Sequence, residues 1–134
     1  MAGYSKTSLS KKLGIKAGLK ILVVQEPDGY WEWLAPLPDV TVVQKPAKQT
    51  LDFAHVFVQS QRDFEKIFNK VKSMLTKSGM LWISWPKKSS GIISDLDENK
   101  IREFGLANGL VDVKVCAVDD TWSGLKFVYR IKDR

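Results

Sequence analysis

A short polar loop, Lys87 to Gly91, combines residue types that bind small anions. It places two lysines beside two serines and a glycine. Ammonium groups, hydroxyls and free backbone amides in one turn can hold a phosphate or a carboxylate. The loop lacks the glycine-before-lysine spacing of a P-loop, and Lys-Ser-Gly turns are also common in solvated loops. We therefore consider Lys87, Lys88 and Ser89 candidate anion ligands, with an ordinary surface loop as the alternative.

Acidic residues form a second candidate group. Glu26 and Asp28 follow one apolar run, and Asp119 and Asp120 follow another. Paired carboxylates can act as acid and base or hold a cation. Aspartate near glycine is also ordinary turn chemistry, so a purely structural role for these residues stays open.

The chain holds one histidine and one cysteine, His55 and Cys116. Transition-metal sites and histidine-based triads need several imidazoles or thiolates at one point, so the sequence predicts no metal site. A single cysteine also excludes an internal disulfide. Both residues lie inside apolar runs, where a satisfied core histidine and a small buried hydrophobe are the expected roles.

Apolar runs alternate with helical patterns along the chain. After Ser60, apolar residues recur at spacings of three and four from Phe64 to Leu75, which predicts a helix that Lys77 and Gly79 close. Shorter helices are predicted after Thr7, at Tyr30, and after a capping pair of Asp95 and Glu98. Six strands are expected at residues 19–24, 40–43, 53–58, 80–85, 111–118 and 125–131.

This alternation predicts an α/β fold, a mostly parallel sheet with helices on both faces. The last two strands are joined by only about six residues, so they should be antiparallel neighbours. In such sheets, ligands bind at the carboxyl ends of the parallel strands. Eight residues near these ends are candidate ligand contacts: Glu26, Asp28, Tyr30, Lys87, Lys88, Ser89, Asp119 and Trp122.

Net charge and hydropathy limit the class of protein. The formal charge is +6 over 134 residues, and the first 20 residues hold five lysines and no acid. That basic segment suits a solvated surface, and it also fits an RNA-associated accessory protein. No apolar run is long enough for a membrane span, and the start lacks a signal-peptide pattern. We expect a single cytoplasmic domain spanning residues 1–134.

Several segments together resemble a known family. They are Lys12-Leu13-Gly14-Ile15-Lys16, Ser84-Trp85-Pro86-Lys87-Lys88 and the run from Trp122 to Arg130. Across the whole chain, the sequence resembles a bacterial family of short proteins of unknown function. That family in turn is similar to a trimmed class I S-adenosylmethionine-dependent methyltransferase. The resemblance implies a Rossmann-like sheet with the strand order 2-1-3-4-6-5.

The sequence departs from that family at the cofactor site. The resemblance implies a glycine-rich loop after the first strand and an acid that holds the ribose at the end of the second. Here the first loop keeps only Gly29 and carries Pro27, and the second strand ends at Gln44 and Lys45. S-adenosylmethionine is therefore a possible ligand that the sequence does not favour. Our main hypothesis is a domain without an assigned reaction that binds an anionic small molecule or a macromolecular partner, such as a protein, at the carboxyl edge of the strands. A divergent methyltransferase is the alternative.

Overall fold

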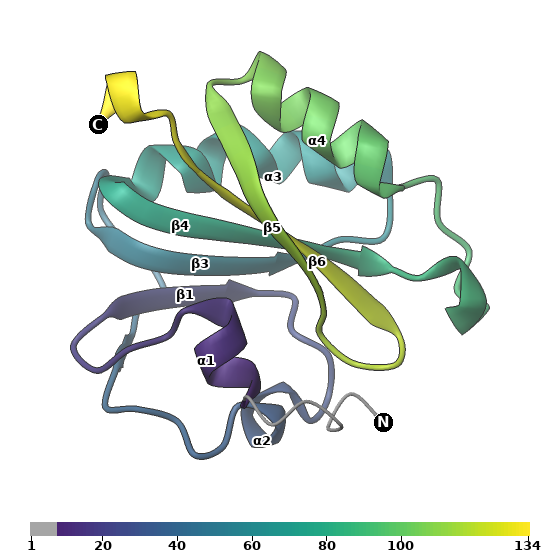
Figure 1. Ribbon diagram of the computed structural model, residues 1–134, viewed down its shortest axis with the longest axis horizontal. Helices are drawn as coiled ribbons and strands as arrows, with labels where there is room; N and C mark the ends of the chain where they lie inside the picture. The colour runs from purple at the N-terminus through teal and green to yellow at the C-terminus, as the bar shows by residue number, and fades with distance from the viewer. Residues whose placement is uncertain (1–7) are drawn as a thin grey trace.

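The computed structural model describes residues 8–134. They form one six-stranded sheet in the order β2-β1-β3-β4-β6-β5. Strands β1 to β4 are parallel to one another, and β6 runs antiparallel to both β4 and β5. The predicted fold class and strand order are confirmed (Figure 1). The elements are α1 (Leu9–Leu13), β1 (Lys20–Val24), α2 (Tyr30–Trp33), β2 (Thr41–Val42), β3 (Leu51–Phe57), α3 (Gln61–Met74), β4 (Leu75–Pro86), η2 (Lys88–Ser90), α4 (Glu98–Ala107), β5 (Leu110–Ala117), β6 (Trp122–Tyr129) and η3 (Ile131–Asp133).

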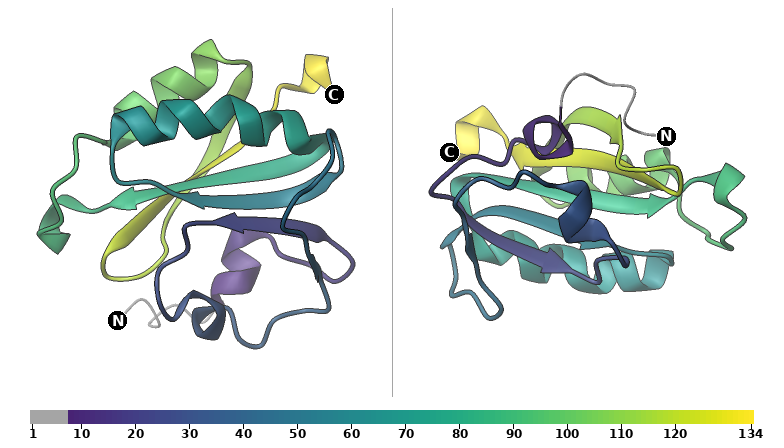
Figure 2. Two further views of the ribbon diagram at one scale, coloured as in Figure 1. Left: turned by 180° about the vertical axis from the view of Figure 1, so that it is seen from behind. Right: turned by 90° about the horizontal axis from the view of Figure 1, so that it is seen from below.

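Helices lie on both faces of the sheet. α1 and α3 are on opposite sides in the view from below (Figure 2, right). Alternate residues of each strand point to opposite faces, so β3 sends Ala54 and Val56 to the side of α3 and α4, and Phe53 and Phe57 to the side of α1 and α2. We name these two sides the α3/α4 face and the α1/α2 face.

The end of α3 differs from the prediction. The helix stops at Met74, and Leu75 already has an extended backbone with φ −75° and ψ 142°. Lys77 and Gly79 therefore belong to β4 and do not close the helix. A β-carbon on Gly79 would lie only 2.9 Å from the Leu51 carbonyl oxygen. The glycine is thus needed for the close approach of two strands, at an irregularity in the β3–β4 register.

Two helix starts also differ. α4 is capped by Asp97, whose carboxylate accepts from the Lys100 amide, and not by Asp95. Asp95 instead accepts a 2.7 Å hydrogen bond from the Gln61 amide at the start of α3. At α1 the cap is Ser8, which accepts from the Lys11 amide, and the predicted cap Thr7 lies outside the described residues.

The final hairpin is tighter than expected. β6 begins at Trp122, so residues 118–121 are left for the turn, and Ser123 and Gly124 pair within the sheet. The two strands are antiparallel neighbours, as predicted. Trp122 therefore lies at the start of a strand and not in a loop.

Candidate functional site

Three of the predicted site residues lie together where β4 ends and β6 begins. The Lys87 ammonium donates to the Asp119 carbonyl oxygen at 2.8 Å, and the Lys87 amide donates to the Thr121 carbonyl at 2.8 Å. The Asp119 carboxylate accepts from the Trp122 amide at 2.7 Å. Lys87 and Asp119 thus already serve the turn between β5 and β6, as the structural alternative predicts.

The prediction that Tyr30 contacts a ligand at the carboxyl edge of the sheet is wrong. It is only 1% exposed, and its hydroxyl lies 2.8 Å from His55 Nδ1. Burial raises the pKa of this phenol. Tyr30 is therefore a core residue with an occupied hydrogen-bonding group, and it has no surface open to a ligand.

The other predicted site residues are spread along the surface. Glu26 is exposed and accepts a 3.3 Å hydrogen bond from the Trp31 indole, and Asp28 is exposed in the same loop. Lys88 and Ser89 are exposed in η2. The half-buried Trp122 packs edge-on against Phe57, with ring centroids 5.1 Å apart. Ligand binding by these residues stays a prediction.

His55 is part of a buried polar relay. Its Nε2 lies 2.7 Å from the Ser84 hydroxyl, so Tyr30, His55 and Ser84 form one hydrogen-bonded chain across α2, β3 and β4. Burial lowers the His55 pKa to about 3, which keeps the ring neutral at physiological pH. The expected role of a satisfied core histidine is confirmed. Cys116 is half-buried against the same core, where burial raises its pKa.

A cavity of about 290 Å³ lies at the carboxyl ends of β1 and β3. Gln25 follows β1 and Val58 follows β3, while Lys66 and Lys70 line it from α3. The chain leaves β1 toward β2 and leaves β3 toward β4, in opposite directions along the sheet. This is the topological switch point, the position where open α/β sheets bind their ligands.

A second cavity of about 410 Å³ continues along the same helix. It shares Ile67 and Lys70 with the first cavity, so the two form one groove, which we name the α3 groove. Its walls are mainly apolar, with Lys45 and Gln44 beside them. The remaining lining residues are Leu22, Val24, Pro46, Val71 and Met74.

The groove exists because residues 43–50 contain no helix. They connect β2 directly to β3, so no helix lies over β1 on the α3/α4 face beyond the edge of α3 (Figure 2, left). In the sequence, Arg62, Lys66 and Lys70 form a basic row at spacing four, a pattern that predicts a solvated helix face. The short connection at residues 43–50 is the signal that could have identified the groove.

The part of the chain that the structure describes contains neither a candidate metal site nor a helix that could span a membrane. Residues 8–134 contain no group of three or more histidine, cysteine or acidic residues that could hold a metal ion. None of the helices within this range is long and apolar enough to cross a membrane.

Comparison with solved structures identifies the fold. The chain is similar to DhpI in a complex with SAH, with a TM-score of 0.64 and 13% identity over 92% of this chain and 83% of that one. It is also similar to a SAM-dependent methyltransferase from Aquifex aeolicus, with a TM-score of 0.61 and 15% identity over 87% and 85%. A magnesium protoporphyrin IX methyltransferase from Synechocystis PCC 6803 with bound SAM has a TM-score of 0.59 and 11% identity over 91% and 74%.

Comparisons of the sequence do not assign the chain to a family. No protein-family model matches the chain, and no curated protein matches it. At these low identities, the structural similarity establishes the fold alone. The chain therefore has the Rossmann-like fold of class I SAM-dependent methyltransferases.

Proposed function

We propose that this chain binds a small amphipathic anion in the α3 groove. The observation that carries the proposal is the position of the groove at the switch point, with Lys66 and Lys70 on α3 beside it. Lysines there would hold a carboxylate or phosphate through charge-assisted hydrogen bonds. The apolar walls at Leu22 and Met74 would bury the body of the ligand.

The charge balance of the groove supports an anion. Lys45, Lys66 and Lys70 line it, against Asp63 as the acid among its lining residues. The three lysines and Asp63 are exposed, so the groove carries an excess of positive charge at neutral pH. Such an excess raises the local concentration of anionic ligands.

A divergent SAM-dependent methyltransferase is the second candidate. The comparisons favour this candidate, because solved structures similar to this chain hold SAM or SAH. The same comparisons give no support for a different anionic ligand. The α3 groove also lies at the strand ends where that fold would hold the cofactor.

The residues at those strand ends do not fit S-adenosylmethionine well. After β1, Gln25 and Gly29 have left-handed backbones with φ 58° and 86°, but Pro27 between them has no amide to donate. After β2 the chain offers Gln44 and Lys45, so no carboxylate is present there for the ribose hydroxyls.

Isothermal titration calorimetry separates the two candidates. The ligands are octanoate, adenosine monophosphate, SAM and SAH, and the test variant is Lys66→Gln/Lys70→Gln. The anion proposal expects octanoate or adenosine monophosphate to bind and the double variant to lose at least about tenfold in affinity, since even one well-formed charge-assisted bond contributes about 1.5 to 3 kcal/mol.

The matched control is Lys114→Gln/Lys126→Gln, which removes the same charge from the other face of the sheet. It should bind octanoate and adenosine monophosphate as the parent does. Micromolar binding of SAM or SAH, with no binding of the other two ligands, would replace the anion proposal by the methyltransferase. An equal loss of affinity in both double variants would show that binding depends on the net charge of the protein and not on the α3 groove.

A further inference from the structure

Four lysines gather on the α1/α2 face, away from the α3 groove. Lys114 on β5 and Lys126 on β6 are direct partners in the antiparallel register. α1 contributes Lys12, and the segment after it contributes Lys16. We name Lys12, Lys16, Lys114 and Lys126 the lysine face.

Contacts bring Lys114 and Lys126 to the end of α1. The Lys114 ammonium donates to the Lys12 carbonyl oxygen at 3.0 Å, which brings β5 against the end of α1. The Lys126 ammonium lies next to Gly14, the residue that ends α1. On β6, Leu125 and Phe127 point into the core of the α3/α4 face, so Lys126 between them points to α1.

Among the residues that the structure describes, the charges that act on Lys126 are those of two other lysines. Burial lowers the pKa of Lys126 first, and the nearby Lys114 and Lys16 lower it further. Like charges directly opposite each other on neighbouring strands destabilise a sheet. The arrangement therefore costs the folded protein stability, which favours a function for it.

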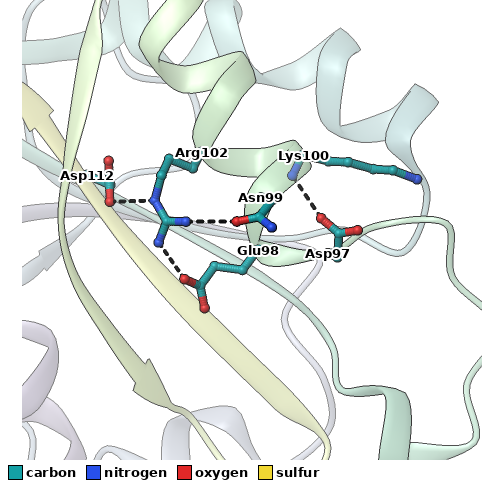
Figure 3. A network of polar contacts seen from close by, with 6 residues as sticks. All are labelled: Asp97, Glu98, Asn99, Lys100, Arg102 and Asp112. Atoms are coloured by element: carbon teal, nitrogen blue, oxygen red, sulfur yellow. Dashed lines mark hydrogen bonds and ion pairs between the residues drawn. The ribbon is translucent and has the colours of Figure 1, made fainter.

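Arg102, on the other face, shows how this fold satisfies a cation when only structure is required. Its guanidinium donates to Asp112 at 2.8 Å and also to Glu98 and Asn99 (Figure 3). Asp112 is two residues before Lys114 on the same strand, yet it is bound to α4. No such carboxylate is among the charges that act on Lys126.

We propose that the lysine face binds the phosphate backbone of a nucleic acid. The lysine face presents four positive charges, from α1, the segment after α1, β5 and β6. A nucleic-acid backbone presents a row of negatively charged phosphates that can contact several of these lysines at once. Lysine side chains are typical phosphate contacts, whereas lysine is depleted at protein–protein interfaces, which favour aromatic residues and arginine. Phosphate contacts carry no base information, so binding should be independent of sequence.

Fluorescence anisotropy with a labelled single-stranded RNA, and with the DNA of the same sequence, tests this proposal over a series of salt concentrations. Four phosphate contacts predict that log K falls with log salt at a slope of about −2.8, since each contact on a single strand contributes about −0.7. RNA and DNA should bind alike. The Lys114→Gln/Lys126→Gln variant should weaken binding roughly tenfold or more at low salt and reduce the slope to about −1.4.

The Lys66→Gln/Lys70→Gln variant is the control, because it removes the same net charge from the α3/α4 face. It should stay within about threefold of the parent in affinity and keep the parent's slope. The proposal is overturned if the parent binds neither strand, if both double variants weaken binding equally, or if polyglutamate competes as well as RNA. The last result would assign the lysine face to an acidic protein.

Discussion

On the α3/α4 face the buried core consists of apolar side chains that include a group of packed phenylalanine rings, while on the α1/α2 face the core includes a relay of hydrogen bonds. Phe68 packs edge-on against Phe64, Phe104 and Phe127, with centroids 5.4 to 5.6 Å apart. On the other face, Tyr30, His55 and Ser84 are joined through their side chains. The two faces of one sheet therefore hold their helices by different means.

Helix length explains the difference. α3 has 14 residues and presents a continuous apolar stripe, so it can be held by burial alone. α1 and α2 have five and four residues, too short to be stable by themselves. Hydrogen bonds anchor them: the Trp82 indole donates to the Leu13 carbonyl at 2.8 Å, and Tyr30 contacts His55.

Phe68→Ala tests the apolar face and should have the largest effect. Phe68 is fully buried, and its removal should lower the free energy of unfolding by about 3 to 5 kcal/mol. Urea denaturation at two pH values measures this loss, which should be the same at both. Ile67→Ala is the control, because Ile67 is only partly buried and lines the α3 groove, so its loss should be smaller. A loss below about 1 kcal/mol for Phe68→Ala would mean that this face contributes little to stability.

The polar face should instead respond to pH through His55. The pKa of this ring is about 3 in the folded protein and 6.5 in a model peptide. Below pH 6.5 the unfolded chain takes up a proton that the folded chain does not, so stability falls as the pH drops from 6.5 toward 3. Each pH unit costs about 1.4 kcal/mol, which gives a loss of about 2 kcal/mol at pH 5.

His55→Gln is the matched variant, because glutamine keeps a donor and an acceptor near Tyr30 and Ser84. Denaturant unfolding from pH 7.5 to pH 5 should show a steep decline for the parent and a flatter one for the variant. The parent and the variant hold the same carboxylates, so the contribution of these groups cancels in the comparison. Parallel curves would mean that His55 takes up its proton in the folded protein as readily as in the unfolded chain.

The sequence predicted the strands well because their apolar runs are bounded by turn residues, as at Pro27 and Pro86. Helix ends were less predictable. A glycine after an apolar helical pattern predicts a helix cap, as at Gly79. In the structure this glycine is needed because the Leu51 backbone approaches it closely, and the sequence does not show that contact. The candidate site shows the same limit. Tyr30 follows a strand end as a ligand contact would, but its partner His55 is 25 residues away and turns it into the core.

The lysine face should show the smallest effect on stability, and one of opposite sign. Lys126→Met removes the charge opposite Lys114 and keeps most of the side-chain length, so it should raise the free energy of unfolding at pH 7 by about 0.2 to 1 kcal/mol. Because the folded state lowers the pKa of Lys126, the charge costs stability while the folded lysine is protonated. The gain should therefore shrink as the pH rises toward 10.5, and added salt should reduce it at pH 7. Lys48→Met, at an exposed position outside the sheet, should change stability by less. A destabilised Lys126→Met would show that the Lys126 ammonium is held by the end of α1 strongly enough to outweigh its repulsion from Lys114, and the lysine face would then be a structural feature like Arg102.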